Sequence, residues 1–226
     1  MIENVLDYVG CKVKNTHQNL HRWKNWGNTT EFAPVFDVPV WVEDLEYEYI
    51  SDLIYLIKTR NPKDNRKTWK TYNIFDWKHK SLDVLLDNFI SSYKKYISEL
   101  GFECRKTLWI RGWAVELESG QGVPNHNHCF HENSYISGNF MVSKNETTTD
   151  YFIPHLSVDN GYYKIENKSN RLTLFPSWLE HKVDPIDDCE RYSIGFDLFT
   201  EECYAYAKTN SNKDDAIMKS LHIEIK

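Results

Sequence analysis

The hydrophobic pattern changes period at Gly101, and this change constrains the fold more than any other feature of the chain. Before Gly101, segments 43–59 and 82–100 carry apolar residues at helical spacing. After it, apolar and polar residues alternate in short segments rich in Val, Ile, Thr and aromatic residues. Six strands are predicted there, at residues 107–117, 135–143, 150–155, 162–166, 171–175 and 191–199.

Two helices followed by at least six short strands are typical of a mainly β fold with flanking α. We expect an antiparallel double-sheet barrel or jelly roll, backed by the N-terminal helices. Ser81 is predicted to cap the second helix, and residues 60–80 are predicted to form a surface loop. The tail suits either a short amphipathic helix or an edge strand.

Composition bounds the partners and the compartment. A net charge of −6 argues against a nucleic-acid or anionic-membrane partner, and no run of about 18 apolar residues suits a membrane helix. The N-terminus lacks the pattern of a signal peptide, and the five cysteines lack disulfide-framework spacing. We therefore expect a protein of the cytoplasm.

The last predicted strand, 191–199, has two different faces. Alternation places Tyr192, Ile194, Phe196 and Leu198 on an apolar face that can pack under the helices, and Arg191, Ser193, Gly195 and Asp197 on the other. If the second face looks into the barrel, Arg191 offers a planar fork to a carboxylate and Ser193 adds a hydroxyl donor. Alternation alone fits equally well a strand edge with Arg191 in solvent.

Histidines gather in the stretch NHNHCFHENSYISG at residues 125–138, which contains His126, His128 and His131. Imidazoles spaced by one residue can point at one metal ion, and three protein ligands leave positions open for substrate. His181 lies in a predicted turn after the strand 171–175 and is a candidate third ligand. A single histidine taken alone is more often structural.

Taken together, these motifs resemble the Fe(II)/2-oxoglutarate-dependent oxygenases, and more narrowly the oxygenase family found in phages and bacteria. The matching residues are Trp113, Gly120, His126-Asn127-His128, Ser137-Gly138, LFPSWLEHKVDP at 174–185 and RYSIGF at 191–196. The resemblance covers about residues 105–200. It implies a double-stranded β-helix (jelly-roll, cupin-like) in a single oxygenase domain 1–226, with helical support at 1–101, the core at 102–200 and a C-terminal tail at 201–226.

The chain departs from the family pattern at three places. Ser137-Gly138 follows His128 by nine residues rather than six, so either the loop has an insertion or His131 and Cys129 take the metal positions. The spacing from Gly120 favours His126 and His128, with His131 near the metal or in a substrate loop. Phe140-Met141 replaces the usual tyrosine, and His128 stands where the wider superfamily has a carboxylate.

The resemblance implies a chemistry and a set of roles. Fe(II) would bind His126, His128 and His181, and 2-oxoglutarate would pair with Arg191 and Ser193. With dioxygen, the enzyme would hydroxylate an unidentified substrate, such as an amino-acid or peptidyl side chain, and release succinate and CO2. Trp113, Trp178 and Phe175 would wall the pocket. The compartment would be the host cytoplasm if the chain is encoded by a phage.

Two other functions fit parts of the pattern. A cupin-type dioxygenase with three histidines needs no 2-oxoglutarate, so it has no use for a clamp made of Arg191 and Ser193. A jelly-roll binding module without catalytic activity would leave the histidines incidental, and it would bind no stoichiometric iron. The sequence names neither the prime substrate nor the oligomeric state.

Overall fold

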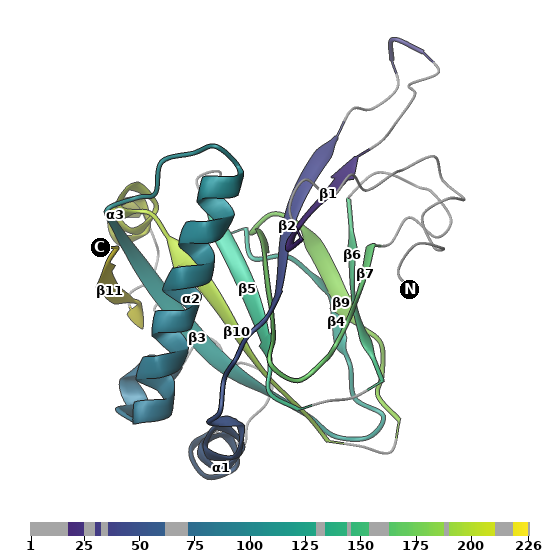
Figure 1. Cartoon of the computed structure of the whole chain (residues 1–226), viewed down its shortest axis with the longest axis vertical. Helices are drawn as coiled ribbons and strands as arrows, with labels where there is room; N and C mark the ends of the chain where they lie inside the picture. The colour runs from purple at the N-terminus through teal and green to yellow at the C-terminus, as the bar shows by residue number, and fades with distance from the viewer. Residues whose placement is uncertain are drawn as a thin grey trace.

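Two antiparallel sheets face each other, and helices cover the outer face of the larger sheet (Figure 1). The computed structural model describes residues 18–24, 30–32, 36–61, 72–129, 134–143, 146–153, 163–187, 190–210 and 219–225. The strands are β1 (Leu20–Lys24), β2 (Asp37–Asp44), β3 (Thr107–Leu117), β4 (Val123–His126), β5 (Ile136–Met141), β6 (Thr148–Phe152), β7 (Tyr163–Glu166), β8 (Arg171–Pro176), β9 (Glu180–Val183), β10 (Arg191–Phe199) and β11 (Leu221–Glu224). The helices are α1 (Ile50–Arg60), the 3-10 helix η2 (Ile74–Trp77), α2 (Lys80–Glu99) and α3 (Glu201–Asn210).

The larger sheet has the order β1-β2-β8-β5-β10-β3-β11, and the smaller sheet has the order β4-β9-β6-β7. All of their strand pairs are antiparallel. The predicted mainly β double-stranded β-helix with flanking helices is confirmed, although the two sheets face each other without closing into a barrel. The interior between the sheets is where a ligand can be enclosed.

Apolar side chains separate into two main clusters on opposite sides of the larger sheet. The first cluster joins α1 and α2 to the outer face of that sheet and includes Leu85 and Phe140. The second lies between the sheets and includes Trp23 and Val40 from the larger sheet with Ile165 from the smaller one. The helices therefore stabilise the sheet from outside, and part of the interior is left for polar groups.

Alternation on β10 is confirmed. Its apolar residues join the cluster under the helices, where the ring of Phe196 stacks on that of Phe89 with centroids 4.1 Å apart. Consecutive side chains of a strand point to opposite faces, so the polar residues of β10 point into the space between the sheets. Arg191 is only 2% exposed, which excludes the solvated strand edge.

The first predicted helix begins later than expected, since α1 starts at Ile50 and not at residue 43. Glu43 and Asp44 end β2, which pairs with both β1 and β8. Glu43 accepts hydrogen bonds from Ser92 of α2 and from Trp41, and Asp44 pairs with Arg171. These tertiary contacts use the acidic side chains that we interpreted as a favourable first helical turn.

The predicted cap of the second helix was wrong by two residues. The N-cap of α2 is His79, whose Nδ1 accepts a hydrogen bond from the backbone N–H of Ser81. Part of the predicted surface loop 60–80 is also buried structure, because η2 packs Phe75 into the core. The side chain of Asn73 explains this, since it bonds to the backbone of β3.

Pattern reasoning located β3, β5, β6, β7, β8 and β10 to within a few residues, and it did not include β1, β2, β4 or β9 among the predicted strands. β4 and β9 have only four residues each, so alternation gives a weak signal there. Both alternatives for the tail occur, because α3 is followed by β11 on the edge of the larger sheet.

Gly138 allows the closest approach of side chains under α2. A Cβ atom at this position would lie 2.2 Å from Cζ and 2.5 Å from Cε1 of Phe196. We expect Gly138→Ala to lower the free energy of unfolding by about 3 kcal/mol, at the upper end of typical overpacking costs.

Urea unfolding of Gly138→Ala, Phe196→Leu and the double variant measures this loss of stability. The double variant should lose at least about 1 kcal/mol less than the sum of the single losses, and strict additivity would contradict the proposed clash.

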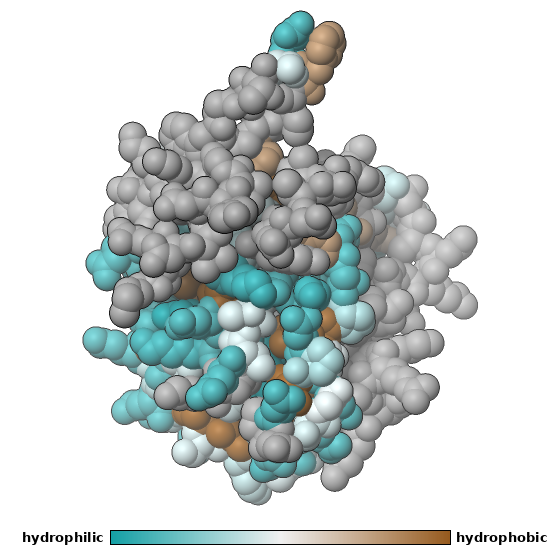
Figure 2. Space-filling model, turned by 90° about the vertical axis from the view of Figure 1, so that its right-hand side faces the viewer, coloured by the Kyte–Doolittle hydropathy of each residue, from teal (hydrophilic) through white to brown (hydrophobic). Residues whose placement is uncertain are grey.

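The described surface is mainly hydrophilic on the side of the smaller sheet. In Figure 2, which shows that side, the hydrophobic residues of the described parts form small separate areas. Among the helices of the described residues, none combines the length and the apolarity that crossing a bilayer requires.

Candidate functional site

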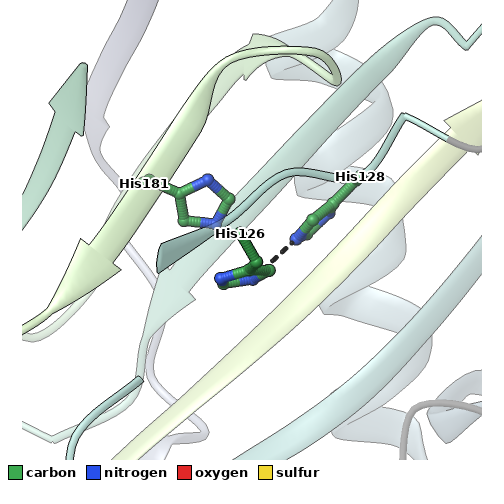
Figure 3. A group of neighbouring side chains, drawn as sticks. All are labelled: His126, His128 and His181. Carbon is green, nitrogen blue, oxygen red and sulfur yellow. Dashed lines mark hydrogen bonds between the residues drawn. The ribbon is translucent and has the colours of Figure 1, made fainter. Parts of the chain in front are cut away.

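Three histidine side chains meet between the sheets. His126 ends β4, His128 follows two residues later, and His181 lies on β9 rather than in the predicted turn. The pairing of β4 with β9 places His126 opposite His181. Each histidine offers one ring nitrogen, and these atoms lie within 4.8 Å of one another (Figure 3).

Backbone carbonyls fix the orientation of two of these rings. The Nδ1 atoms of His126 and His181 lie 2.9 Å from the oxygen of Pro124 and 3.1 Å from that of Leu179. A carbonyl oxygen only accepts, so each Nδ1 carries the proton and donates. The Nε2 atom of each ring is therefore left with a free lone pair, which is the form that binds a metal.

The third ring is fixed by a carboxylate. Nδ1 of His128 donates to Oδ1 of Asp197 over 2.6 Å, which also leaves Nε2 as the free atom. The same oxygen accepts from the hydroxyl of Ser137 at 2.7 Å, and Oδ2 pairs with Arg111 at 2.8 Å. Burial alone would raise the pKa of Asp197, but His128, Arg111 and Ser137 together hold it below its ordinary value.

The pKa values of His126 and His181 favour their neutral forms. Burial, followed by the charge interaction with His128, lowers the pKa of His126, and burial with both neighbours places the pKa of His181 well below its ordinary value. The Nε2 atoms of His126 and His128 are 3.2 Å apart. This is a hydrogen-bond distance, so one of the two nitrogens carries a proton here, and a metal ion bound to both would replace that proton. Three neutral imidazoles with open positions beside them suit a divalent first-row metal such as iron.

Arg191 lies in the same pocket without a carboxylate partner among the described residues. One Nη donates to the hydroxyl of Ser193 at 3.0 Å, the other contacts Sδ of Met141 at 3.3 Å, and Nε has no hydrogen-bond partner. Burial lowers the pKa of Arg191 to about 10, so the guanidinium stays charged at neutral pH. A buried cation held only by a hydroxyl and a thioether is costly unless an anion joins it.

Tyr151 of β6 places a second unsatisfied group near this cation. Its hydroxyl is fully buried and makes no hydrogen bond of good geometry within the described part of the chain, although the Thr173 side chain lies close enough to act on its pKa. Burial raises its pKa, and the charge of Arg191 acts in the opposite direction. The ring also stacks on His181 with centroids 5.6 Å apart. The phenol therefore remains a donor between the histidines and the guanidinium.

Aromatic walls close part of the pocket. Trp113 and Phe175 line it together with the three histidines, Arg191 and Ser193. A Cβ on Gly195 would lie 2.8 Å from the Trp113 ring, so glycine at this position allows the indole to lie flat against β10. The prediction for Trp178 was wrong, because its side chain is 42% exposed.

Sequence comparison identifies the segment that carries the site. Residues 111–197 match the family described as "Putative 2OG-Fe(II) oxygenase". No curated protein matches the sequence. The matched segment runs from Arg111 on β3 to Asp197 on β10, so it contains the three histidines and Arg191 with Ser193.

Solved structures extend the likeness beyond the matched segment, to 72–73% of the chain. A prolyl-4-hydroxylase from Pseudomonas putida aligns with a TM-score of 0.54 and 15% identity over 72% of this chain and 92% of that one. AviO1 from Streptomyces viridochromogenes Tue57 aligns with 0.52 and 9% over 73% and 90%. HygX from Streptomyces hygroscopicus, solved with nickel and 2-oxoglutarate bound, aligns with 0.51 and 8% over 72% and 82%. At these identities the likeness shows the fold alone.

Sequence reasoning predicted five residues for the site, and the structure places His126, His128, His181, Arg191 and Ser193 around one pocket. His131 lies outside the described residues, so the alternative register at that position is not described. Cys129 is exposed and is not one of the converging ligands.

Two further residues of the site were missed. Asp197 was placed on the interior face of its strand but was given no role, and a charged residue on an interior face was the available signal. Tyr151 gave no signal, because a tyrosine in a short aromatic strand is typical of any core.

Proposed function

We propose that the chain is an Fe(II)- and 2-oxoglutarate-dependent dioxygenase, which hydroxylates its substrate and releases succinate and CO2. The observation that carries the proposal is the pairing of two unsatisfied features in one pocket. One ring nitrogen from each of three histidines converges on a single point, and a buried guanidinium has no carboxylate partner among the described residues. A metal ion and a dicarboxylate would satisfy both.

In this proposal His126, His128 and His181 hold the iron. Iron(II), with 2-oxoglutarate and dioxygen, supplies the oxidising chemistry when bound. The chain fixes each ring through its Nδ1 proton, so every Nε2 is oriented before the metal arrives. Trp113 and Phe175 exclude water from the same space.

Arg191 and Ser193 hold the distal carboxylate of 2-oxoglutarate in this proposal. The guanidinium is charged, buried and not used by another acid of the described residues. The phenol of Tyr151 is a third donor, since its hydroxyl is also buried and without a hydrogen bond of good geometry among the described residues. Tyr151 would thereby supply the tyrosine that the resemblance leads us to expect where this chain has Phe140-Met141.

The two alternatives explain less of the pocket. A cupin-type three-histidine dioxygenase accounts for the imidazoles, but it leaves the buried charge of Arg191 without a purpose. A non-catalytic binding module accounts for neither group. We further propose a single oxygenase domain that acts in the cytoplasm, in an infected host if the gene is a phage gene. An amino-acid or peptidyl side chain is the first substrate class to test, because one structural neighbour is named a prolyl-4-hydroxylase.

The test begins without oxygen. Fe(II) and 2-oxoglutarate are added to the pure protein, and a weak visible charge-transfer band is expected from the joint complex. Oxygen is then admitted and succinate is measured, with a panel of amino acids and short peptides present. Wild type should give both signals and His181→Ala neither. If wild type gives no band and no succinate, or if His181→Ala behaves like wild type, the proposal is wrong.

A further inference from the structure

The three candidate ligands differ in the group that accepts the hydrogen bond from their Nδ1 atom. His126 and His181 donate their Nδ1 protons to neutral backbone carbonyls, whereas His128 donates to the carboxylate of Asp197 at 2.6 Å. A hydrogen bond to an ionised acceptor is stronger and shorter than one to a neutral acceptor. His128 is therefore the ring whose donor strength depends on a charged group.

Asp197 is itself held rigidly by three adjacent strands. Across β10 and its neighbours it lies directly opposite Arg111 of β3 on one side and Ser137 of β5 on the other. Oδ2 pairs with Arg111 and Oδ1 accepts from Ser137 and His128, so both carboxylate oxygens are occupied. The carboxylate is 1% exposed. It cannot turn toward the metal position without breaking these bonds.

A ligand set of three histidines gives a nearby carboxylate a possible role in balancing the charge of the metal. Three neutral imidazoles leave the full charge of a divalent cation uncompensated, whereas non-haem iron sites with two histidines and one carboxylate place an anion on the metal. A carboxylate behind a ligating histidine raises the basicity of the ring and fixes its tautomer. Asp197 stands at this place behind His128.

We propose that Asp197 is a positioning residue for the metal, which delivers the charge of a carboxylate to the ion through the imidazole of His128. The inference rests on the proposed function, since it assumes that His128 binds a metal. Arg111 then has a defined part, because its ion pair holds Oδ2 of Asp197 at 2.8 Å and leaves Oδ1 aimed at His128. Removing the carboxylate should weaken metal binding by about 10- to 100-fold, the usual effect of losing such a partner.

The test measures metal affinity and not turnover. Co(II) is titrated into metal-free protein without 2-oxoglutarate, with a competing chelator, and its visible absorption reports the ligand set. The variants are Asp197→Asn and the pair Arg111→Met/Asp197→Asn. The double variant removes both buried charges, so no guanidinium is left without its carboxylate. It can therefore be measured even if Asp197→Asn alone does not fold. Ser137→Ala is the matched control, because it removes a hydrogen bond from the same carboxylate oxygen but not the charge.

A second measurement separates positioning from mere stability. In the Zn(II) form, the exchangeable Nδ1 proton of His128 should give a far-downfield proton resonance, because it lies in a short hydrogen bond to a carboxylate. The resonance should move upfield in both Asp197 variants and stay in place in Ser137→Ala. A loss of stability without a change in this hydrogen bond would not move the signal.

The outcomes separate the two proposals. The inference is supported if Co(II) affinity falls at least 10-fold in the folded Asp197 variants while Ser137→Ala stays within about 3-fold of wild type. It is overturned if the folded Asp197 variants bind Co(II) as tightly as wild type, or if Ser137→Ala loses as much as they do. If wild type itself binds no Co(II), the proposed function fails first.

Discussion

Replacing Arg191 by methionine is expected to weaken the binding of 2-oxoglutarate by about 2–5 kcal/mol, or roughly 30-fold to several thousand-fold. Methionine keeps most of the volume and removes the charge. The loss is large because the pocket is buried, so the carboxylate would lose its only strong counterion in a place where water cannot replace it. Titration of the oxygen-free Fe(II) complex with 2-oxoglutarate, followed by the charge-transfer band, measures the affinity.

Three further variants test which features of the pocket determine the affinity for 2-oxoglutarate. Arg191→Lys keeps the charge but loses the planar fork, so its affinity should lie between those of wild type and Arg191→Met. Tyr151→Phe removes one donor and should cost roughly tenfold. Arg105→Gln is the control, since Arg105 is half exposed and pairs with Glu202 at the surface. Equal affinities for wild type and Arg191→Met would contradict the anion pocket.

The same substitution should not destabilise the protein without its ligand. Burial lowers the pKa of Arg191, which means that burying its charge reduces the free energy of unfolding of the ligand-free protein. Met in its place removes that penalty, so we expect unfolding in urea to occur at the same or a higher concentration than in wild type. A site that gains affinity at the expense of ligand-free stability is typical of functional residues.

Alternation along β10 explains why so much could be predicted from the sequence. A strand with strict apolar and polar faces fixes one side against the helices, so Arg191 and Ser193 had to share the opposite side. The same periodicity located the long strands and α2. Local pattern is reliable where an element is long and has one buried face.

The missed features depend on contacts between distant segments. The local pattern at residues 43 and 44 predicts the start of a helix. The contacts of Glu43 with Ser92 and of Asp44 with Arg171, which the local pattern does not contain, hold both residues in β2. Asp197 receives its role only when Ser137, 60 residues away, and Arg111, 86 residues away, pair with the same strand. Such roles follow from strand order, which no local pattern in a single sequence specifies.

The second large effect is expected from the metal. A ligand that binds only the folded state stabilises it by about 2.7 kcal/mol at 100 times its dissociation constant and by about 4.1 kcal/mol at 1,000 times. For a chain of this size the larger value corresponds to a rise in melting temperature of roughly 8–16 °C. Thermal unfolding without oxygen, with Fe(II) or Co(II) added and then removed by a chelator, measures the rise and its reversal.

The physical reason for this rise lies in the arrangement of the ligands. The fold brings one ring nitrogen of each of His126, His128 and His181 within 4.8 Å of the others, whereas the unfolded chain holds them apart, so a metal ion binds the folded state far more tightly. His181→Ala should remove most of the metal-induced rise, because two imidazoles bind far less tightly than three. His222→Ala is the matched control, since His222 contacts Trp109 on β3 and is not one of the three converging histidines. An equal rise in His181→Ala and wild type would show that the metal binds elsewhere, and the argument from converging ring nitrogens would then be wrong.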